Sequence, residues 1–176
     1  MEPSSPRHAI CLASDQNYID YAYVTVLSIA DHSSPEHQYE IVILGNGILE
    51  YKKQLFYRLN SKNLSVSFID MEKYIDSSKM QNFFTSGHIT MASYFRYFIP
   101  SIFKDYNKVI YVDTDTIIRD DIYKIFSYNI DNYMLGVVNH PHAPACASQE
   151  IKNYRSEVLH IIPDEYFNAG VLLYNI

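Results

Sequence analysis

The 176-residue sequence has no tryptophan and only two cysteines, five glycines and seven prolines. So little glycine and proline excludes a collagen-like or linker-like chain. The cysteines, Cys11 and Cys146, form neither a Cys-x-x-Cys pair nor a zinc-ligand spacing. Cys11 lies in an apolar run, so we expect a small buried residue there. These features predict a reduced, cytoplasmic protein that folds without disulfides.

Clustered positive charge is also missing. Fourteen Lys and Arg stand against 20 Asp and Glu, which gives a formal net charge of −6. Without a basic run, the chain lacks the cations that bind nucleic acid or an anionic membrane surface. No apolar stretch approaches the roughly 18–20 residues of a transmembrane helix, and the N-terminus has no apolar signal core. We therefore expect no nucleic-acid partner and no transmembrane segment.

What the chain does contain is typical of a globular domain. Hydrophobic residues make up 48% and charged residues 19%, and the length fits one domain. Residues 1–7 (MEPSSPR) are predicted to be a loose lead, and residues 8–176 the folded domain. The chain closes on VLLYNI, an apolar run with which domains seldom end.

Short apolar segments alternate with amphipathic ones along the chain. Helices are predicted from Ile19 to the segment 31–35, over 48–59 and over 91–99, where Pro100 would stop the last one. In the first helix, one apolar face is predicted from residues at helical spacing: Ile19, Ala22, Tyr23, Val26, Leu27 and Ala30. Strands are predicted at 8–14, 39–44, 64–69, 108–112, 134–138 and 166–174. Apolar strands alternating with helices indicate an α/β domain with a covered, mostly parallel sheet.

Three carboxylates follow directly on apolar strands: Asp15, Asp70 and Asp113. Parallel sheets bind their ligands at the carboxyl ends of the strands. Asp113 and Asp115 form an Asp-x-Asp pair whose carboxylates would share one face of an extended chain. Such hard oxygen ligands suit Mg²⁺ or Mn²⁺. A solvated turn, or caps for a helix starting near 120–121, would explain the pair equally well.

Neither common glycine-rich phosphate cradle, Gly-x-x-x-x-Gly-Lys-Ser/Thr or Gly-x-Gly-x-x-Gly, occurs in the sequence. An acidic protein that binds a diphosphate therefore needs a divalent cation to neutralise it. The pair Asp113 and Asp115 would supply ligands for that cation.

Four blocks resemble glycosyltransferase family 8, the group of glycogenin and the bacterial lipooligosaccharide galactosyltransferases. They are Ala13–Tyr18, Ser93–Arg96, Val109–Asp115 and Phe167–Asn175, in the family's order and spread over 8–176. The resemblance implies a Rossmann-like nucleotide-sugar transferase domain of the GT-A type. It also implies transfer of a hexose, with retention, from a UDP-sugar to a glycan or lipid-linked glycan acceptor. The implied cofactor is Mn²⁺, with Mg²⁺ as the alternative.

For the nucleotide, the resemblance implies that Ala13, Asp15 and Asn17 contact the uridine and that Tyr18 stacks on the base. Asp15 would accept from the uracil ring N–H. The alternative for Asp15 is a turn former or cap before the first helix. Tyr18 is one of 17 tyrosines, so taken alone it is a weak candidate.

For the metal and sugar, the resemblance makes Asp113 and Asp115 the ligands of the ion that bridges the diphosphate. Asp113 would also approach the ribose or the sugar. Arg96 would meet the donor sugar or orient an aspartate, unless it is a surface ion-pair partner. Asn168 and Ala169 would line the sugar pocket, unless they only form a turn.

A further residue implied for the acceptor side of the sugar site is His88, for which an exposed loop position is the alternative. The implied catalytic set is Arg96, Asp113 and Asn168, acting through departure of UDP. His140 and His142 are spaced like ligands but have no third partner nearby, so a loop explains them better.

The sequence departs from the family in having no downstream His-x-x-Gly-x-x-Lys-Pro motif, which carries the third metal ligand, and no acceptor-binding residues. We expect a domain that lacks its C-terminal part. One alternative is a non-catalytic nucleotide-sugar-binding domain. Another is a haloacid dehalogenase-type phosphatase with Asp113 as nucleophile and Asp115 as acid/base, which is disfavoured because 112 residues precede its first motif. Self-association, the donor sugar and the acceptor stay open.

Overall fold

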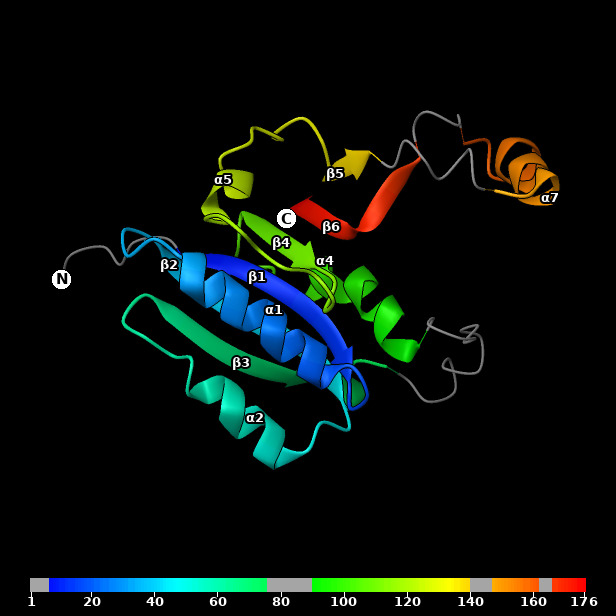
Figure 1. The fold of residues 1–176 in the computed structure, drawn as a ribbon. Helices are drawn as coiled ribbons and strands as arrows, with labels where there is room; N and C mark the ends of the chain where they lie inside the picture. The colour runs from blue at the N-terminus through cyan, green and yellow to red at the C-terminus, as the bar shows by residue number, and fades with distance from the viewer. Residues whose placement is uncertain (1–6, 76–89, 140–146, 162–165) are drawn as a thin grey trace.

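The computed structural model describes residues 7–75, 90–139, 147–161 and 166–176 (Figure 1). These residues form a six-stranded sheet with the order β3-β2-β1-β4-β6-β5. The strands are β1 (Arg7–Asp15), β2 (Gln38–Asn46), β3 (Leu64–Asp70), β4 (Lys108–Val112), β5 (Leu135–Asn139) and β6 (Phe167–Asn175). Strands β3, β2, β1 and β4 are parallel, whereas β6 runs antiparallel to both β4 and β5. The predicted α/β fold with a mostly parallel sheet is confirmed.

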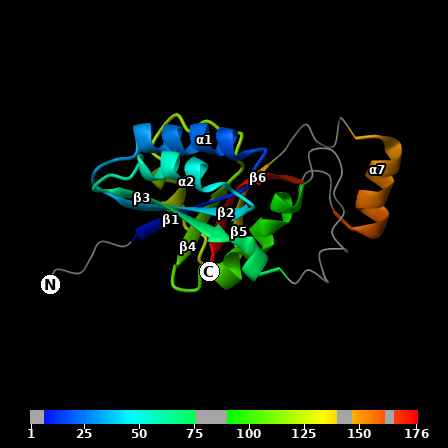
Figure 2. The ribbon, with the colours of Figure 1, turned by 90° about the horizontal axis from the view of Figure 1, so that it is seen from below.

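Helices cover both faces of the sheet (Figure 2). One face carries α1 (Ile19–His32), α2 (Glu50–Tyr57) and α5 (Tyr123–Phe126), and the other carries the 3₁₀ helix η2 (Met91–Phe98) and α4 (Ile99–Ile102). The remaining helical segments are η1 (Met71–Lys73), α7 (Gln149–Asn153) and the single π turn η3 (Tyr154–Val158). None of the helices in the described ranges is long and apolar enough to cross a membrane.

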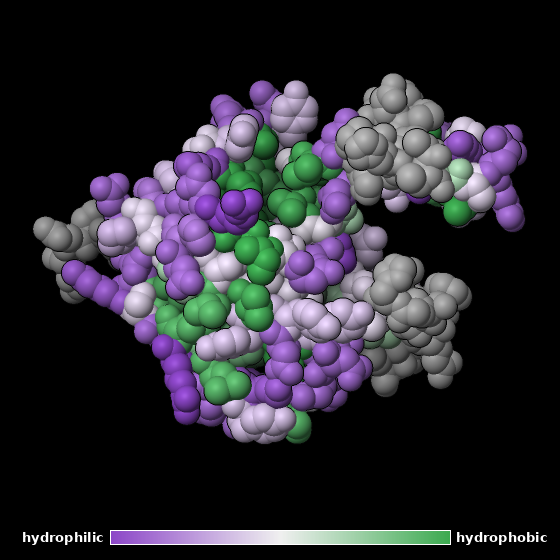
Figure 3. All heavy atoms as spheres, viewed as in Figure 1, coloured by the Kyte–Doolittle hydropathy of each residue, from purple (hydrophilic) through white to green (hydrophobic). Residues whose placement is uncertain are grey.

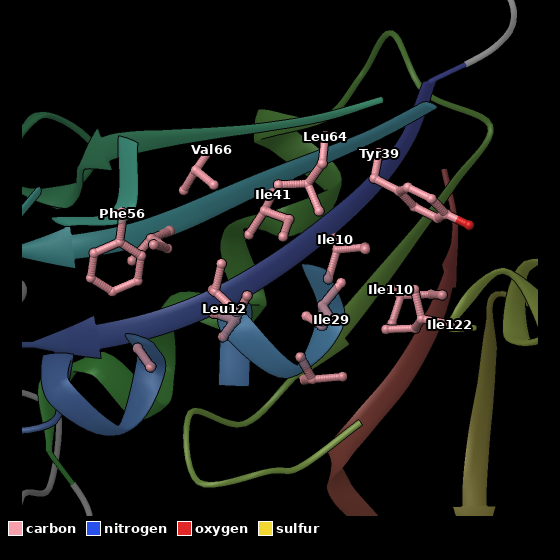
Figure 4. Packing of buried hydrophobic residues seen from close by; sticks show 14 of the residues in the cluster. Ile10, Leu12, Ile29, Tyr39, Ile41, Phe56, Leu64, Val66, Ile110 and Ile122 are labelled. Atoms are coloured by element: carbon pink, nitrogen blue, oxygen red, sulfur yellow. The ribbon is translucent and has the colours of Figure 1, made fainter. Parts of the chain in front are cut away.

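Strand β1 shows why the central strands are apolar throughout. Ile10 and Leu12 pack toward α1 and α2 in one hydrophobic core (Figure 4), whereas Ala9, Cys11 and Ala13 pack toward η2 and α4 in a second core. Both faces of the strand are therefore covered, as expected for a parallel sheet. The predicted burial of Cys11 is confirmed, and this burial raises the pKa of its thiol.

Two predicted boundaries were wrong. Arg7, placed in the loose lead, begins β1: it pairs with Gln38, and its guanidinium lies 3.5 Å from the Glu40 carboxylate. Pro100 does not end the third helix, because the 3₁₀ helix over 91–98 continues directly into α4 with Pro100 in its first turn. A proline is tolerated there, since the first helical N–H groups have no intrahelical acceptor.

The inward face of α1 differs from the predicted one. Ala22 and Val26 are buried as expected, but Leu27 is 36% exposed, and Ile29 and Thr25 take inner positions. Figure 3 shows hydrophobic side chains on the molecular face that carries α1, within a largely hydrophilic surface. Thr25 was not among the residues predicted for the inner face, and a buried hydroxyl needs a hydrogen-bond partner. The loop that follows β4 provides that partner.

Candidate functional site

A pocket of about 190 Å³ opens at the carboxyl ends of β1 and β4. Its walls come from β1, the residue before α1, the start of η2, β4 and the loop after β4. The residues that line it are Ala13, Ser14, Tyr18, Thr90, Ala92, Ser93, Arg96, Tyr111, Asp113, Thr114 and Asp115. Five residues predicted for the site from three separate sequence blocks are thus brought to one place. They are Ala13, Tyr18, Arg96, Asp113 and Asp115.

The carboxylate of Asp113 is held through one of its two oxygens. Oδ1 accepts a 2.7 Å hydrogen bond from the Tyr111 hydroxyl, and it lies 3.2 Å from Nη2 of Arg96. The backbone N–H of Asp113 donates to the carbonyl of Gly170 at 2.8 Å, which fastens the end of β4 to β6. The orientation of Asp113 is therefore set by β4, η2 and β6 together.

Arg96 connects η2 to both neighbouring strands. Its Nε donates to the carbonyl of Ser93 at 2.8 Å, its Nη1 donates to the carbonyl of Ala169, and its Nη2 pairs with Asp113. The guanidinium carbon lies 4.7 Å from the centroid of the Tyr111 ring. Only 15% of the Arg96 side chain is exposed, so a surface ion pair was the wrong alternative. The ion pair with Asp113 is a contact that an aspartate-orienting residue makes, and contact with the donor sugar stays a prediction.

Tyr111 is a site residue that sequence inspection did not single out. It is 1% exposed, and burial, followed by the negative charge of Asp113, raises the pKa of its phenol well above the ordinary value despite the opposing charge of Arg96. The phenol therefore stays protonated at neutral pH and acts as a donor. A signal was available, because residues two apart in a strand share a face.

The segment from Asn168 to Gly170 lies at the start of β6, where the pairing with β5 shifts register. Oδ1 of Asn168 accepts from the N–H of Gly170 at 2.6 Å. A β-carbon at position 170 would come within 2.6 Å of Oδ2 of Asp113 and 2.9 Å of Oδ1 of Asn168. Glycine is required there because the Asp113 carboxylate occupies the space. Asn168 and Ala169 are exposed, lie within β6 at the register shift against β5, and are not among the residues that line the pocket. Their contact with a sugar stays a prediction.

The turn before α1 is organised by Asp15. Its Oδ1 accepts from the N–H groups of Asn17 and Tyr18 at 2.9 and 3.1 Å, which is the turn-forming role considered as its alternative. Ala13 and Tyr18 line the pocket, whereas Asp15 and Asn17 are not part of its described lining. The Tyr18 ring lies beside that of Tyr21, with 5.8 Å between the ring centroids.

The oxygen donors of the pocket fit a hard divalent cation. Asp115 is exposed and lines the same pocket as Asp113, and the missing side chain of Gly170 keeps space at Oδ2 of Asp113. Two carboxylates of this kind suit Mn²⁺ or Mg²⁺, which complete their coordination with phosphate and water oxygens. Within the part of the chain that the structure describes, no group of three or more His, Cys, Asp or Glu side chains could hold a metal.

Of the remaining candidates, the structure describes only Asp70. Asp70, the third carboxylate expected at this edge, caps η1 by accepting from the N–H of Glu72 at 3.1 Å, and it lines a separate hollow beside Lys73. His88, His140 and His142 fall outside the described residues.

Comparisons with known proteins place the chain among glycosyltransferases. General stress protein A of Bacillus subtilis (strain 168) is 25% identical over 167 residues, which are 93% of this chain and 54% of that protein. The apo structure of the bifunctional glycosyltransferase WbbM superimposes with a TM-score of 0.81 and 26% identity, over 99% of this chain and 32% of that chain. Galactosyltransferase LgtC, solved with donor and acceptor sugar analogues, superimposes with a TM-score of 0.74 and 26% identity, over 95% of this chain and 57% of that chain.

The fold is that of a GT-A type glycosyltransferase domain. Residues 9–176 match Glycosyl transferase family 8, and the chain belongs to that family. The resemblance carried by the four sequence blocks is thereby confirmed, and the phosphatase alternative is disfavoured. The chain spans about half or less of the length of the first curated relatives that it matches.

Proposed function

We propose that the chain binds the donor of a glycosyl transfer, in which a hexose moves with retention from a UDP-sugar to a glycan or lipid-linked glycan acceptor. The observation that carries the proposal is the Asp113 carboxylate at the end of β4. Tyr111 and Arg96 orient it, and it shares one pocket with Asp115. Membership of Glycosyl transferase family 8 and the similarity to LgtC support the proposal.

Asp113 and Asp115 would hold Mn²⁺, with Mg²⁺ as the alternative. When bound, the ion would neutralise the diphosphate and stabilise the negative charge that develops on departing UDP. Arg96 and Tyr111 occupy Oδ1 of Asp113 and leave Oδ2 as the oxygen for ligation. The formal net charge of −6 makes a cation necessary if this chain is to hold a diphosphate.

The nucleoside would lie at the β1 side of the pocket, against Ala13 and Tyr18. Asp15 would accept from the uracil N–H through Oδ2, because its Oδ1 already accepts from two N–H groups in the turn before α1. Asn17 would also contact the uridine. The pocket of about 190 Å³ is smaller than the roughly 300–1,000 Å³ of a typical ligand site. A UDP-sugar would therefore extend past the described lining.

The donor sugar would lie toward the start of β6. Gly170 lies directly beside Asp113, and the Asn168 side chain lies next to both. Under this proposal Asn168 contacts the sugar, while Arg96 acts mainly by orienting Asp113. His88 remains assigned to the acceptor side by the family resemblance alone.

Calorimetric titration with UDP, with and without Mn²⁺, tests the donor site. We expect binding that depends on the metal and is lost in Asp113→Asn and Asp115→Asn. Asp131→Asn, at an exposed acid between α5 and β5, is the matched control and should bind as the wild type does. Equal UDP affinity with and without metal would contradict the role of the aspartate pair.

A non-catalytic nucleotide-sugar-binding protein is the second candidate function. It is favoured by the lack of a group of three metal-ligating side chains among the described residues. Incubation with a panel of UDP-sugars, followed by chromatography for released UDP, separates the two functions. Metal-dependent UDP binding without turnover of any donor would support the second candidate. Hydrolysis of p-nitrophenyl phosphate should be absent in either case.

A further inference from the structure

Thr25 is a fully buried polar residue on α1 whose hydroxyl faces the loop after β4. Its Oγ1 lies 2.6 Å from the carbonyl oxygen of Thr114 and 2.7 Å from that of Thr116. The carbonyl of Tyr21, one turn back in α1, lies farther away at 3.3 Å. One hydroxyl proton is thus shared mainly between two loop carbonyls, and these are the carbonyls on either side of Asp115.

Ser28, one turn farther along α1, holds the end of the same loop. Its Oγ accepts from the N–H of Ile118 at 3.0 Å and donates to the carbonyl of Thr25 at 2.7 Å. Two neighbouring hydroxyls of one helix therefore contact the segment 114–118 at three backbone groups. The Thr114 contact is buried and the other two are part-buried. Backbone groups that lose partners while shielded from water carry a desolvation cost, so these contacts favour this position of the segment.

We propose that Thr25, supported by Ser28, is a positioning residue that sets the place of Asp115 relative to Asp113. Neither hydroxyl residue lines the pocket, so each acts through the loop and not by touching a ligand. Asp113 is held by β4, η2 and β6, whereas the loop that carries Asp115 is held from the α1 side. The consequence for metal binding rests on the proposed function, but the positioning of the loop does not.

The same helix also links the two sides of the pocket. Tyr18, the residue directly before α1, lines the pocket at its nucleoside side. Thr25 lies two turns farther along and holds the loop at the metal side. Because a helix is stiff over two turns, α1 places both sides of the pocket as one element.

Three variants isolate the hydroxyl of Thr25. Thr25→Val keeps the branched shape and removes the hydroxyl, whereas Thr25→Ser keeps the hydroxyl and removes a methyl group. Ile29→Val is the matched control, because it trims a buried side chain on the same helix and leaves both loop contacts intact. Ser28→Ala, which removes the acceptor of the Ile118 amide, serves as the second variant if Thr25→Val does not fold.

The first measurement is hydrogen exchange of the segment 114–118 in the metal-free protein, normalised to β1. We expect exchange about tenfold faster in Thr25→Val, the factor that corresponds to loss of one hydrogen bond, with Thr25→Ser and Ile29→Val close to the wild type. The second measurement is the affinity for UDP in the presence of Mn²⁺. It should fall about tenfold in Thr25→Val and be restored in Thr25→Ser.

Unchanged exchange in Thr25→Val, or equal acceleration in Ile29→Val, would overturn the positioning role. Faster exchange with wild-type UDP affinity would show that the loop is held but that its place does not matter for the ligand, which also overturns the proposal. If the wild type itself does not bind UDP with Mn²⁺, the proposed function fails. The exchange result then decides the positioning of the loop by itself.

Discussion

The hydroxyl of Tyr111 donates a 2.7 Å hydrogen bond to Oδ1 of Asp113, two residues farther along the chain. The donor is buried in the sheet and the acceptor stands at the edge of the pocket. Arg96 reaches the same oxygen from η2. Tyr111, a residue of the hydrophobic core, thus orients the carboxylate that we propose as a metal ligand.

Replacing Tyr111 with Phe should weaken metal-dependent UDP binding about tenfold, because a hydrogen bond to a charged group is lost. Calorimetry with UDP and Mn²⁺ measures the change. Tyr106→Phe is the matched control, since its phenol donates at 2.7 Å to the carboxylate of Glu40, away from the pocket. Equal losses of affinity in the two variants would show that the effect is a general one on the fold.

A methyl group at position 170 should disturb the site directly. The β-carbon of Gly170→Ala would lie 2.6 Å from Oδ2 of Asp113, so the carboxylate must move. We expect UDP affinity with Mn²⁺ to fall more than tenfold, with a loss in the free energy of unfolding of about 1–3 kcal/mol from overpacking. Calorimetry and urea unfolding measure the two effects.

Gly136→Ala is the control for that prediction. Its β-carbon would meet Leu173 and Ile130 at 3.3 and 3.4 Å, in the same sheet but outside the pocket. It should lower stability modestly and leave UDP affinity unchanged. Wild-type affinity in Gly170→Ala would contradict the assignment of Oδ2 as the ligating oxygen.

The pair of Arg96 and Asp113 should show measurable coupling in stability. A double-mutant cycle with Arg96→Gln and Asp113→Asn, followed by urea unfolding, should give an interaction free energy of about 1 kcal/mol, as is usual for residues in one hydrogen-bonded network. The exposed ion pair of Lys124 and Asp120 is the comparison and should show much weaker coupling. Similar coupling in both cycles would mean that Arg96 does not fix Asp113.

The strands could be predicted from sequence because their apolar runs follow from burial on both faces. Leu12 in one core and Cys11 in the other illustrate the pattern. The direction of β6 could not be predicted, since a run of apolar residues is equally compatible with a parallel and an antiparallel strand. The prediction that Leu27 lies on the inner face of α1 was also wrong. An apolar residue at the border of a helix face can be either buried or exposed.

In the candidate site, the charged residues Arg96 and Asp113 could be found from sequence blocks, but their supports could not. Tyr111 looks like a core aromatic residue, and Thr25 looks like a surface residue of an amphipathic helix. Their roles depend on contacts formed only in the folded chain: Thr25 and Thr114 are 89 positions apart. Pattern alone finds groups that carry charge, whereas the hydrogen bonds that orient those groups require the fold.

The final prediction concerns pH and a cluster of aromatic rings away from the pocket. His8 packs against His37, Tyr123 and Phe126, with 4.9 Å between its ring centroid and each of the last two. Burial, followed by the nearby His37, lowers the pKa of His8 below its ordinary value of 6.5, and Asp121 opposes this shift only in part. Below about pH 6.5 the unfolded chain therefore binds more protons at this position than the folded one.

Stability should consequently fall as the pH is lowered from 6.5 through the pKa of His8 in the folded protein. The variant His8→Phe keeps an aromatic ring in the cluster and removes the titrating group, so its free energy of unfolding should decrease less over the same interval. Urea unfolding at a series of pH values between 7.5 and 5 measures both proteins. Parallel pH profiles for the two would mean that His8 contributes nothing to the acid sensitivity of the fold.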